Sequence, residues 1–145
     1  MFRRPIIFAL LSLSLVACAQ TAAPAFVLQT SREKIPLTVE VVDTEPAREK
    51  GLMMRTSLAP NTGMWFVFDE EKPLTFWMKN TLIPLDILFF DGQKHVVAIV
   101  EDMVPCTVPD PQCARYPSQK PARYALELPA GFVKMHDVKV GDAIE

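Results

Sequence analysis

Two apolar runs, separated by an Asp-Gly pair, make up residues 85–101, LDILFFDGQKHVVAIVE. The pair Asp91-Gly92 is the strongest hairpin signal in the chain, because both residue types tolerate the positive φ angles of a tight turn. Outward from this hairpin, further short apolar or alternating segments recur, and prolines interrupt the chain between them. The expected strands are residues 26–28, 37–41, 64–68, 75–79, 85–90, 95–101 and 124–128.

This spacing predicts a mainly β fold (α+β at the margin), built as one compact barrel-like or sandwich-like domain with one short helix. It is not the pattern of a parallel sheet with crossover helices. The helix is expected within residues 43–51, DTEPAREKG, where Pro46 suits a first turn and Gly51 can end it. A length of 145 residues agrees with a single core.

Composition excludes some classes of protein. Half of the residues are hydrophobic and only 22% are charged, which is not the composition of a disordered chain. The formal net charge of −2 argues against a nucleic-acid partner held through its phosphates.

The N-terminus indicates export. Residues 1–17 carry Arg3 and Arg4 before an apolar stretch too short to span a bilayer, as in a signal peptide. Leu15-Val16-Ala17-Cys18 resembles a bacterial lipobox, which predicts cleavage before Cys18 and a lipid anchor on its thiol. We expect a lipid-attached tether with a first short strand (residues 18–33) and a β domain (residues 34–145), on the periplasmic side of a bacterial membrane. Cleavage after Ala19 would instead leave a soluble periplasmic protein.

The remaining cysteines, Cys106 and Cys113, bracket a proline-rich loop and are expected to form a disulfide in an oxidising compartment. Two cysteines without a nearby histidine fall short of a zinc site, and their spacing is not that of a C-x-x-C redox motif. Copper(I) held by methionines with His95 or His136 is a minor hypothesis, since no tight methionine cluster occurs. We therefore expect no metal and no cofactor.

Two carboxylates, Asp86 and Glu127, stand among large apolar residues. They could act as the acid and base of a hydrolytic enzyme. The favoured interpretation is structural, with each carboxylate accepting hydrogen bonds that fix a turn. Asn80 and Thr81 could donate to Asp86, and Arg55 could pair with either carboxylate.

Four stretches have a familiar sequence: GLMMR (51–55), GMWFVF (63–68), FWMKNTLIPLD (76–86) and LELPAG (126–131). Together they resemble the domain-of-unknown-function family number 192 (DUF192, the UPF0127 group), in order over about residues 35–144. The resemblance implies a compact, mainly β, barrel-like domain with a short helix, in a family of bacterial and archaeal proteins of which many are exported. It implies no established activity. Met54 and Trp65 depart from the residues usual in relatives, an aromatic and an aliphatic residue respectively.

We expect an exported, lipid-tethered protein that binds a small ligand, a glycan being one candidate, or that serves as an envelope accessory module. In this hypothesis Trp77 forms a flat apolar wall and polar side chains orient the ligand. A hydrolytic enzyme and a structural or interaction protein are the alternatives, and no catalytic residue is assigned. The candidate ligand-binding residues are Arg55, Trp77, Met78, Asn80, Thr81, Asp86 and Glu127.

Overall fold

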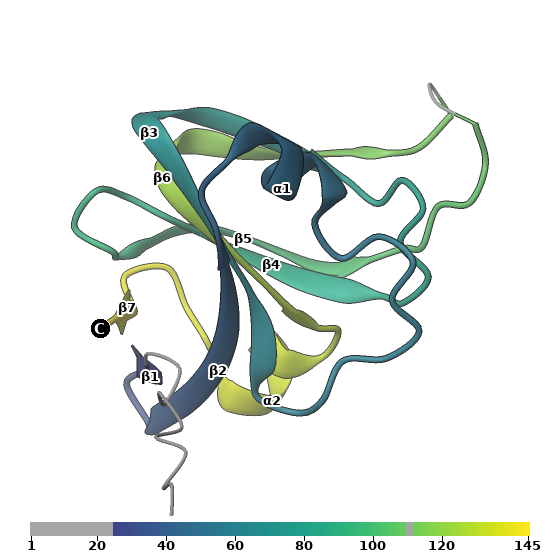
Figure 1. The fold of residues 1–145 in the computed structure, drawn as a ribbon. Coiled ribbons are helices and arrows are strands. Elements are labelled where there is room, and N and C mark those ends of the chain that lie inside the picture. The colour runs from purple at the N-terminus through teal and green to yellow at the C-terminus, as the bar shows by residue number, and fades with distance from the viewer. Residues whose placement is uncertain (1–24, 110–111) are drawn as a thin grey trace, which may run out of the picture.

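The structure is a computed structural model, and it describes residues 25–109 and 112–145. Within this part the chain forms seven strands and two short helices (Figure 1). In chain order they are β1 (Ala25–Gln29), β2 (Lys34–Val42), α1 (Glu45–Lys50), β3 (Thr62–Trp77), β4 (Leu85–Phe90), β5 (Val96–Met103), β6 (Arg115–Pro129), α2 (Phe132–His136) and β7 (Ala143–Ile144).

The strands form one curled sheet in the order β5-β4-β6-β3-β2-β1-β7 (Figure 1). Neighbouring strands are antiparallel except β2 and β3, which are parallel and joined by a crossover that contains α1. The two edges of the sheet approach each other near β7. There the Val96 amide donates to the Asp142 carbonyl at 2.7 Å, and the Ile144 amide donates to the Lys94 carbonyl at 3.1 Å. The expected mainly β, barrel-like class is confirmed as a half-barrel.

Several expected elements are present. Strands β4 and β5 form the hairpin that Asp91-Gly92 predicts, although the turn runs over residues 91–95. The Asp91 carboxylate holds this turn by accepting from the amides of Gln93 and His95, both at 2.9 Å. Helix α1 lies where it was expected, with proline in its first turn and Gly51 at its C-terminal end.

Three features differ from the expectation. Segment 64–68 and the first three residues of segment 75–79 belong to one long strand, β3, which ends at Trp77 and whose bend at residues 69–72 is polar and exposed. A second helix, α2, is present; its five residues are too few to give a helical pattern in the sequence. The parallel β2–β3 pair was not expected, because strand patterns alone do not reveal which strands become neighbours.

Two apolar clusters lie on opposite faces of the central strands. The first fills the inside of the half-barrel, where Trp65 and Leu126 pack with α2 residues such as Phe132. The second includes Phe66 and Phe89 on the other face. The bent outer part of β3 covers this second cluster, since the Phe76 ring meets Phe66 edge-on at a centroid distance of 5.0 Å. Alternate residues of β3, β4 and β6 therefore serve two separate cores.

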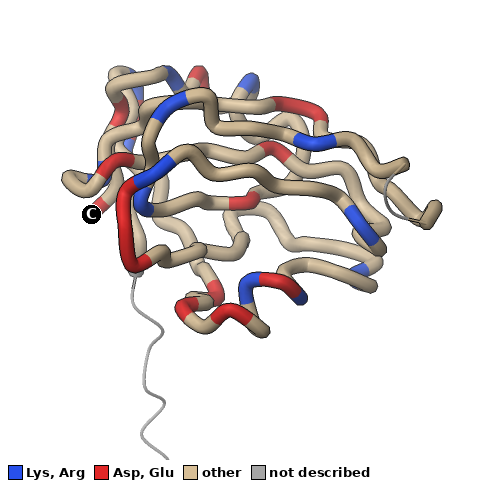
Figure 2. Tube along the Cα trace, turned by 90° about the horizontal axis from the view of Figure 1, so that it is seen from above, with Lys and Arg blue, Asp and Glu red and all other residues tan. Residues whose placement is uncertain are grey.

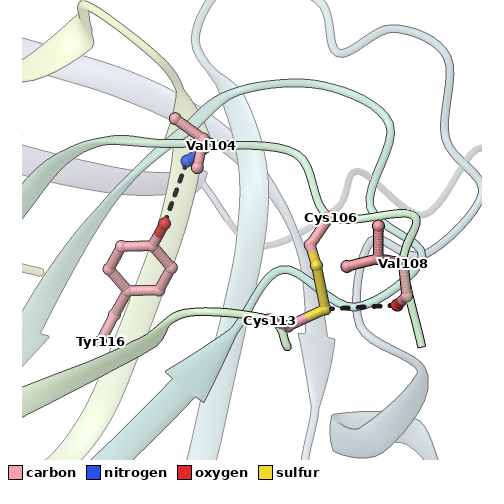
Figure 3. The surroundings of a disulfide bond; sticks show 5 residues. All are labelled: Val104, Cys106, Val108, Cys113 and Tyr116. Carbon is pink, nitrogen blue, oxygen red and sulfur yellow. Dashed lines mark hydrogen bonds between the residues drawn. A yellow bond between two sulfur atoms is a disulfide. The ribbon is translucent and has the colours of Figure 1, made fainter. Parts of the chain in front are cut away.

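The expected disulfide between Cys106 and Cys113 is present, with the two Cα atoms 5.7 Å apart (Figure 3). Close to it, the Val104 amide donates to the Tyr116 hydroxyl at 3.2 Å. The expected lipidation site, Cys18, and the expected signal peptide lie outside the described residues. In the described ranges, neither helix is long and apolar enough to cross a membrane.

Candidate functional site

The residue that defines the site is Glu127, in the middle of the sheet. Its strand, β6, lies between β3 and β4, where Glu127 is paired with Met64 on one side and Ile87 on the other. The residue is only 5% exposed, and no hydrogen bond or ion pair joins its carboxyl group to another described residue. Burial alone raises the pKa of Glu127 to about 8. Near neutral pH the carboxyl group is therefore protonated and can donate a hydrogen bond.

Glu127 lines a cavity of about 330 Å³, a volume within the usual range for small-molecule sites. Thr81 also lines it, and both parts of the bent strand β3 form its walls. The apolar lining residues are Leu52, Met53, Phe66, Phe68, Phe76 and Trp77, and the charged ones besides Glu127 are Glu45, Arg48, Glu49, Lys50, Lys72 and Lys79. The cavity thus combines an aromatic wall, a single buried carboxyl group and a charged entrance.

The bend in β3 creates this cavity. The pairing of β3 with β6 shifts register between Val67 and Lys72, and beyond that point Phe76 packs against the second cluster and Trp77 lines the cavity. An exposed, charged bend is the natural place for such an irregularity, because no buried side chain has to be accommodated there.

Helix α1 forms another wall, although none of its residues is buried. Arg48 attaches the helix to the sheet by donating to the Val67 carbonyl at 2.9 Å and to the Asp43 carbonyl. Its guanidinium carbon also lies 5.0 Å from the centre of the Phe68 ring. Gly51 then ends the helix with φ of 44°, a conformation that favours glycine, and the chain turns inward to the buried Leu52.

The disulfide loop positions the segment that follows β3. The Asn80 amide donates to the Cys106 carbonyl at 2.7 Å, and the Cys106 amide donates to the Met78 carbonyl at 3.2 Å. On the other side of this segment, the Met54 amide donates to the Asn80 carbonyl at 2.8 Å. These bonds fix the backbone between Trp77 and Thr81, a segment that contributes three lining residues, Trp77, Lys79 and Thr81.

Trp77 contacts two cationic side chains. The Lys79 ammonium group is 4.8 Å and the Arg115 guanidinium carbon 4.4 Å from the ring. Contacts of this kind favour the ring's orientation and keep cations near the cavity.

Of the predicted ligand-binding residues, the structure brings together Trp77, Thr81 and Glu127 around the cavity. Met78 is a core residue, 1% exposed. Asn80 contributes backbone hydrogen bonds from a positive-φ conformation. These two residues support the site's backbone but do not line the cavity.

Arg55 is not part of the site, which corrects the expectation that it pairs with Asp86 or Glu127. Its guanidinium group binds the Glu40 carboxylate at 2.6 Å, and both residues line a separate depression together with other residues of β2 and with residues 57–59, 62 and 63. The parallel pairing of β2 with β3 determines this partner, because it places Glu40 of β2 level with the start of β3.

Asp86 is also outside the cavity. It is fully buried, with one carboxylate oxygen accepting from the Asp102 amide and the other from the Val133 amide, both at 2.9 Å. The expected donors, Asn80 and Thr81, do not supply these bonds. Because Ile87, the next residue, is paired with Glu127, the Asp86 and Glu127 side chains point to opposite faces of the sheet. The two carboxyl groups share no cleft, so this geometry does not support an acid and base pair.

The sequence interpretation missed the cavity residues on α1, directly after it and on β3, notably Arg48, Leu52, Phe66, Lys72 and Phe76. A signal was available for the aromatic pair, since Phe66 and Phe76 both lie in the stretches that carry the family resemblance. The two histidines lie beside single carboxylates, with His95 at 3.7 Å from Asp91 and His136 at 2.9 Å from Glu33. Among residues 25–109 and 112–145, no group of three or more His, Cys, Asp or Glu side chains could hold a metal ion.

Known proteins resemble this chain over most of its length. The DUF192 family model, described as "Uncharacterized ACR", matches residues 26–145. A UPF0127 protein of Pyrococcus abyssi is 29% identical over 109 residues, which are 74% of this chain and 84% of that protein. A UPF0127 protein of Thermococcus gammatolerans is 30% identical over 112 residues, which are 73% of this chain and 64% of that protein.

Solved structures share the fold. One from Sinorhizobium meliloti, described as a candidate transcription regulator, is 40% identical with a TM-score of 0.77 and covers 83% of this chain and 90% of its own. Another from Novosphingobium aromaticivorans, described as a protein of unknown function, is 30% identical with a TM-score of 0.77 and covers 83% of each chain.

Proposed function

We propose that this chain, which belongs to the DUF192 family, is a binding module that holds a small ligand in the cavity lined by Glu127. The observation that carries the proposal is the state of the Glu127 carboxyl group: it is buried, has no partner among the described residues and faces the cavity.

Stability alone does not account for this carboxyl group. Its neighbours in the strand, Leu126 and Leu128, are fully buried core residues, and an apolar residue at position 127 would avoid the cost of burying a polar group without a partner. Among the described residues no side-chain oxygen or nitrogen that is shut off from solvent lacks a partner, so the Glu127 oxygens, which have none, reach the cavity space and suit a partner from outside. The walls and volume of the cavity add support, because ligand sites are typically apolar hollows with few polar groups.

The hydrolytic alternative has less support. The other carboxylates that line the cavity, Glu45 and Glu49, lie on the exposed surface of α1. A description as a transcription regulator suits this chain poorly as well, since its formal net charge is −2 and DNA-binding surfaces are strongly basic.

We also propose that the module is exported and tethered through Cys18. The signal-like residues 1–17 support export, and so does the Cys106–Cys113 disulfide, because disulfides persist mainly in oxidising compartments.

A fragment screen tests the binding proposal. We would titrate a library of small organic compounds into the isotope-labelled protein and follow backbone amide signals by NMR. Compounds that shift signals of cavity residues in the wild type should lose this effect in Thr75→Trp, because Thr75 is an exposed lining residue and an indole there fills the space. The matched control, Thr107→Trp, changes an exposed threonine that does not line the cavity, and should bind normally. The proposal is wrong if no compound perturbs the cavity residues, or if both variants behave alike.

A further inference from the structure

We propose that the ligand is an amphipathic organic anion: an apolar, preferably aromatic body that carries an acidic group at one end and an uncharged acceptor oxygen at the other. This inference rests on the proposed function and names the ligand class. The acceptor oxygen binds the Glu127 carboxyl group inside the cavity, and the acidic group lies among the cations at the entrance.

The inner end of the cavity selects for an acceptor. Burial keeps the pKa of Glu127 high, so the carboxyl group presents an O–H donor near neutral pH. A carbonyl, ether or hydroxyl oxygen of the ligand can accept that hydrogen bond. A ligand with a cationic inner end would instead require the ionised carboxylate, which burial disfavours.

The walls select for an apolar body. Phe66 and Phe76 line the cavity together with Trp77, and Leu52 closes it from the crossover. Besides Glu127, the uncharged polar side chains in the lining are those of Thr75 and Thr81. A glycan presents hydroxyl groups along its whole body, and apart from Glu127 and the two threonines the side chains that could bind them are Trp77, through its indole N–H, and the charged ones of the entrance. The lining therefore fits an aromatic acid better than a sugar.

The entrance selects for negative charge. Four cationic side chains line the cavity, against two exposed carboxylates, Glu45 and Glu49. Figure 2 shows acidic and basic positions interspersed along the trace, so this local excess is not part of a generally basic surface. Among the described residues, no ion pair engages Lys50, Lys72 or Lys79, which leaves three ammonium groups for a ligand's acidic group.

Four compounds with one benzene ring test each end of the ligand separately. Para-acetylbenzoate has both the anion and the acceptor, para-ethylbenzoate lacks the acceptor, acetophenone lacks the anion, and para-acetylbenzylamine replaces the anion by a cation. We expect para-acetylbenzoate to bind most tightly by NMR titration, with each omission weakening affinity by about tenfold. Tighter binding of the amine, or equal binding of all four, overturns the inference while leaving the cavity a ligand site. If none of the four, nor any member of the larger fragment library, reaches the cavity, the proposed function itself fails.

Variants of Glu127 test the hydrogen bond. Glu127→Gln keeps a donor and should bind para-acetylbenzoate within about threefold of wild type, whereas Glu127→Leu should bind about tenfold more weakly. As the pH rises through about 8, wild-type affinity should fall because the ionised carboxylate repels the anion and donates nothing. Glu127→Gln retains the other charged groups of the cavity but has no carboxyl group at position 127. Its affinity for para-acetylbenzoate should therefore fall less over the same pH range than that of the wild type. Affinities of both variants equal to wild type would exclude the hydrogen bond.

Variants of the entrance test the charge. Lys72→Gln and Lys79→Gln should each weaken para-acetylbenzoate but not acetophenone, because only the former carries a charge. Lys34→Gln, which changes an exposed lysine of β2 that does not line the cavity, should leave both affinities unchanged. If the two cavity variants bind both probes like wild type, the anion does not lie at this entrance.

Discussion

Glu127 lowers the stability of the folded protein whenever it is ionised, because folding buries its carboxyl group away from water. Met64 and Ile87 are its partners on the adjacent strands; the Ile87 side chain has no hydrogen-bonding group, and Met64 offers only the weakly accepting sulfur of its thioether. The group therefore links the protonation state of one residue to the stability of the whole domain.

The first prediction concerns the pH dependence of this effect. The folded-state pKa of Glu127 is about 8 and the ordinary value is 4.5, so the folded protein binds this proton more tightly than the unfolded chain. The stabilisation that comes from this tighter proton binding is fully present below pH 4.5 and is lost as the pH rises to about 8. The loss in the free energy of unfolding is on the order of 5 kcal/mol. Glu127→Gln should become progressively more stable relative to wild type across that window. Urea unfolding at a series of pH values measures the difference, and a difference independent of pH would contradict the assignment.

Asp86 gives the opposite case, a buried carboxylate whose two oxygens both have donors. In Asp86→Asn the side-chain NH₂ group, a donor, replaces one of the two acceptor oxygens and faces a backbone N–H group that is also a donor. The lost hydrogen bond lowers the free energy of unfolding by about 1–3 kcal/mol. We expect a melting temperature several degrees lower in calorimetry, with ligand binding in the cavity retained. Asp102→Asn is the matched control. The Asp102 side chain is exposed, and the backbone N–H of residue 102 still donates to the Asp86 carboxylate in this variant. An unchanged melting temperature for Asp86→Asn would show that these bonds contribute little.

At the scale of single residues, the sequence singles out both carboxylates but cannot separate their roles. Each stands between apolar neighbours in a strand pattern, and the alternation within one strand is the same for both. Only the pairing of Ile87 with Glu127 shows that they face opposite sides. The partner of Arg55 was equally inaccessible, because the parallel neighbour strand that supplies Glu40 follows from tertiary structure.

At the scale of elements, strands and the hairpin could be predicted because their signals are local: apolar alternation, prolines and Asp91-Gly92. The continuity of β3 could not, because its exposed residues 69–72 read as a break between two strands. The cavity depends on that bend, so its aromatic wall was missed along with it. Helix α1 was predicted from its proline and glycine, but its contact with the cavity follows from Arg48 and the Val67 carbonyl.

The tight approach of β3 to β6 gives a prediction at this scale. A Cβ atom on Gly63 would lie 2.3 Å from the Glu127 carbonyl oxygen, which neither strand can accommodate without moving. Gly63→Ala should therefore destabilise the protein by about 3 kcal/mol or more in urea unfolding. In Gly92→Ala the nearest atom is the exposed Glu71 carboxylate oxygen at 3.0 Å, which can move, so this control should stay within about 1 kcal/mol of wild type. Equal stability of the two variants would contradict the close approach.

At the scale of the whole molecule, the proposed tether makes a prediction about location. If Cys18 carries the lipid, Cys18→Ser in a bacterial host should move the protein from the membrane to the soluble fraction, because no other anchor is proposed. Fractionation followed by immunoblotting measures this, with wild type as the reference and Cys113→Ser as the control for loss of a cysteine elsewhere. Membrane association that persists in Cys18→Ser would refute the lipid anchor.

The separation of the two apolar clusters by one layer of backbone has a consequence for how relatives can diverge. Substitutions on the cavity side, at positions such as Phe76 or Thr81, touch few of the side chains that hold α2 and the half-barrel together. Effects of changes on the two sides should then add almost independently, as they do for distant sites in general. With this arrangement the residues that line the cavity can change, in evolution or by design, so that the same fold binds a different ligand. The first apolar cluster, which packs against α2, need not change with them.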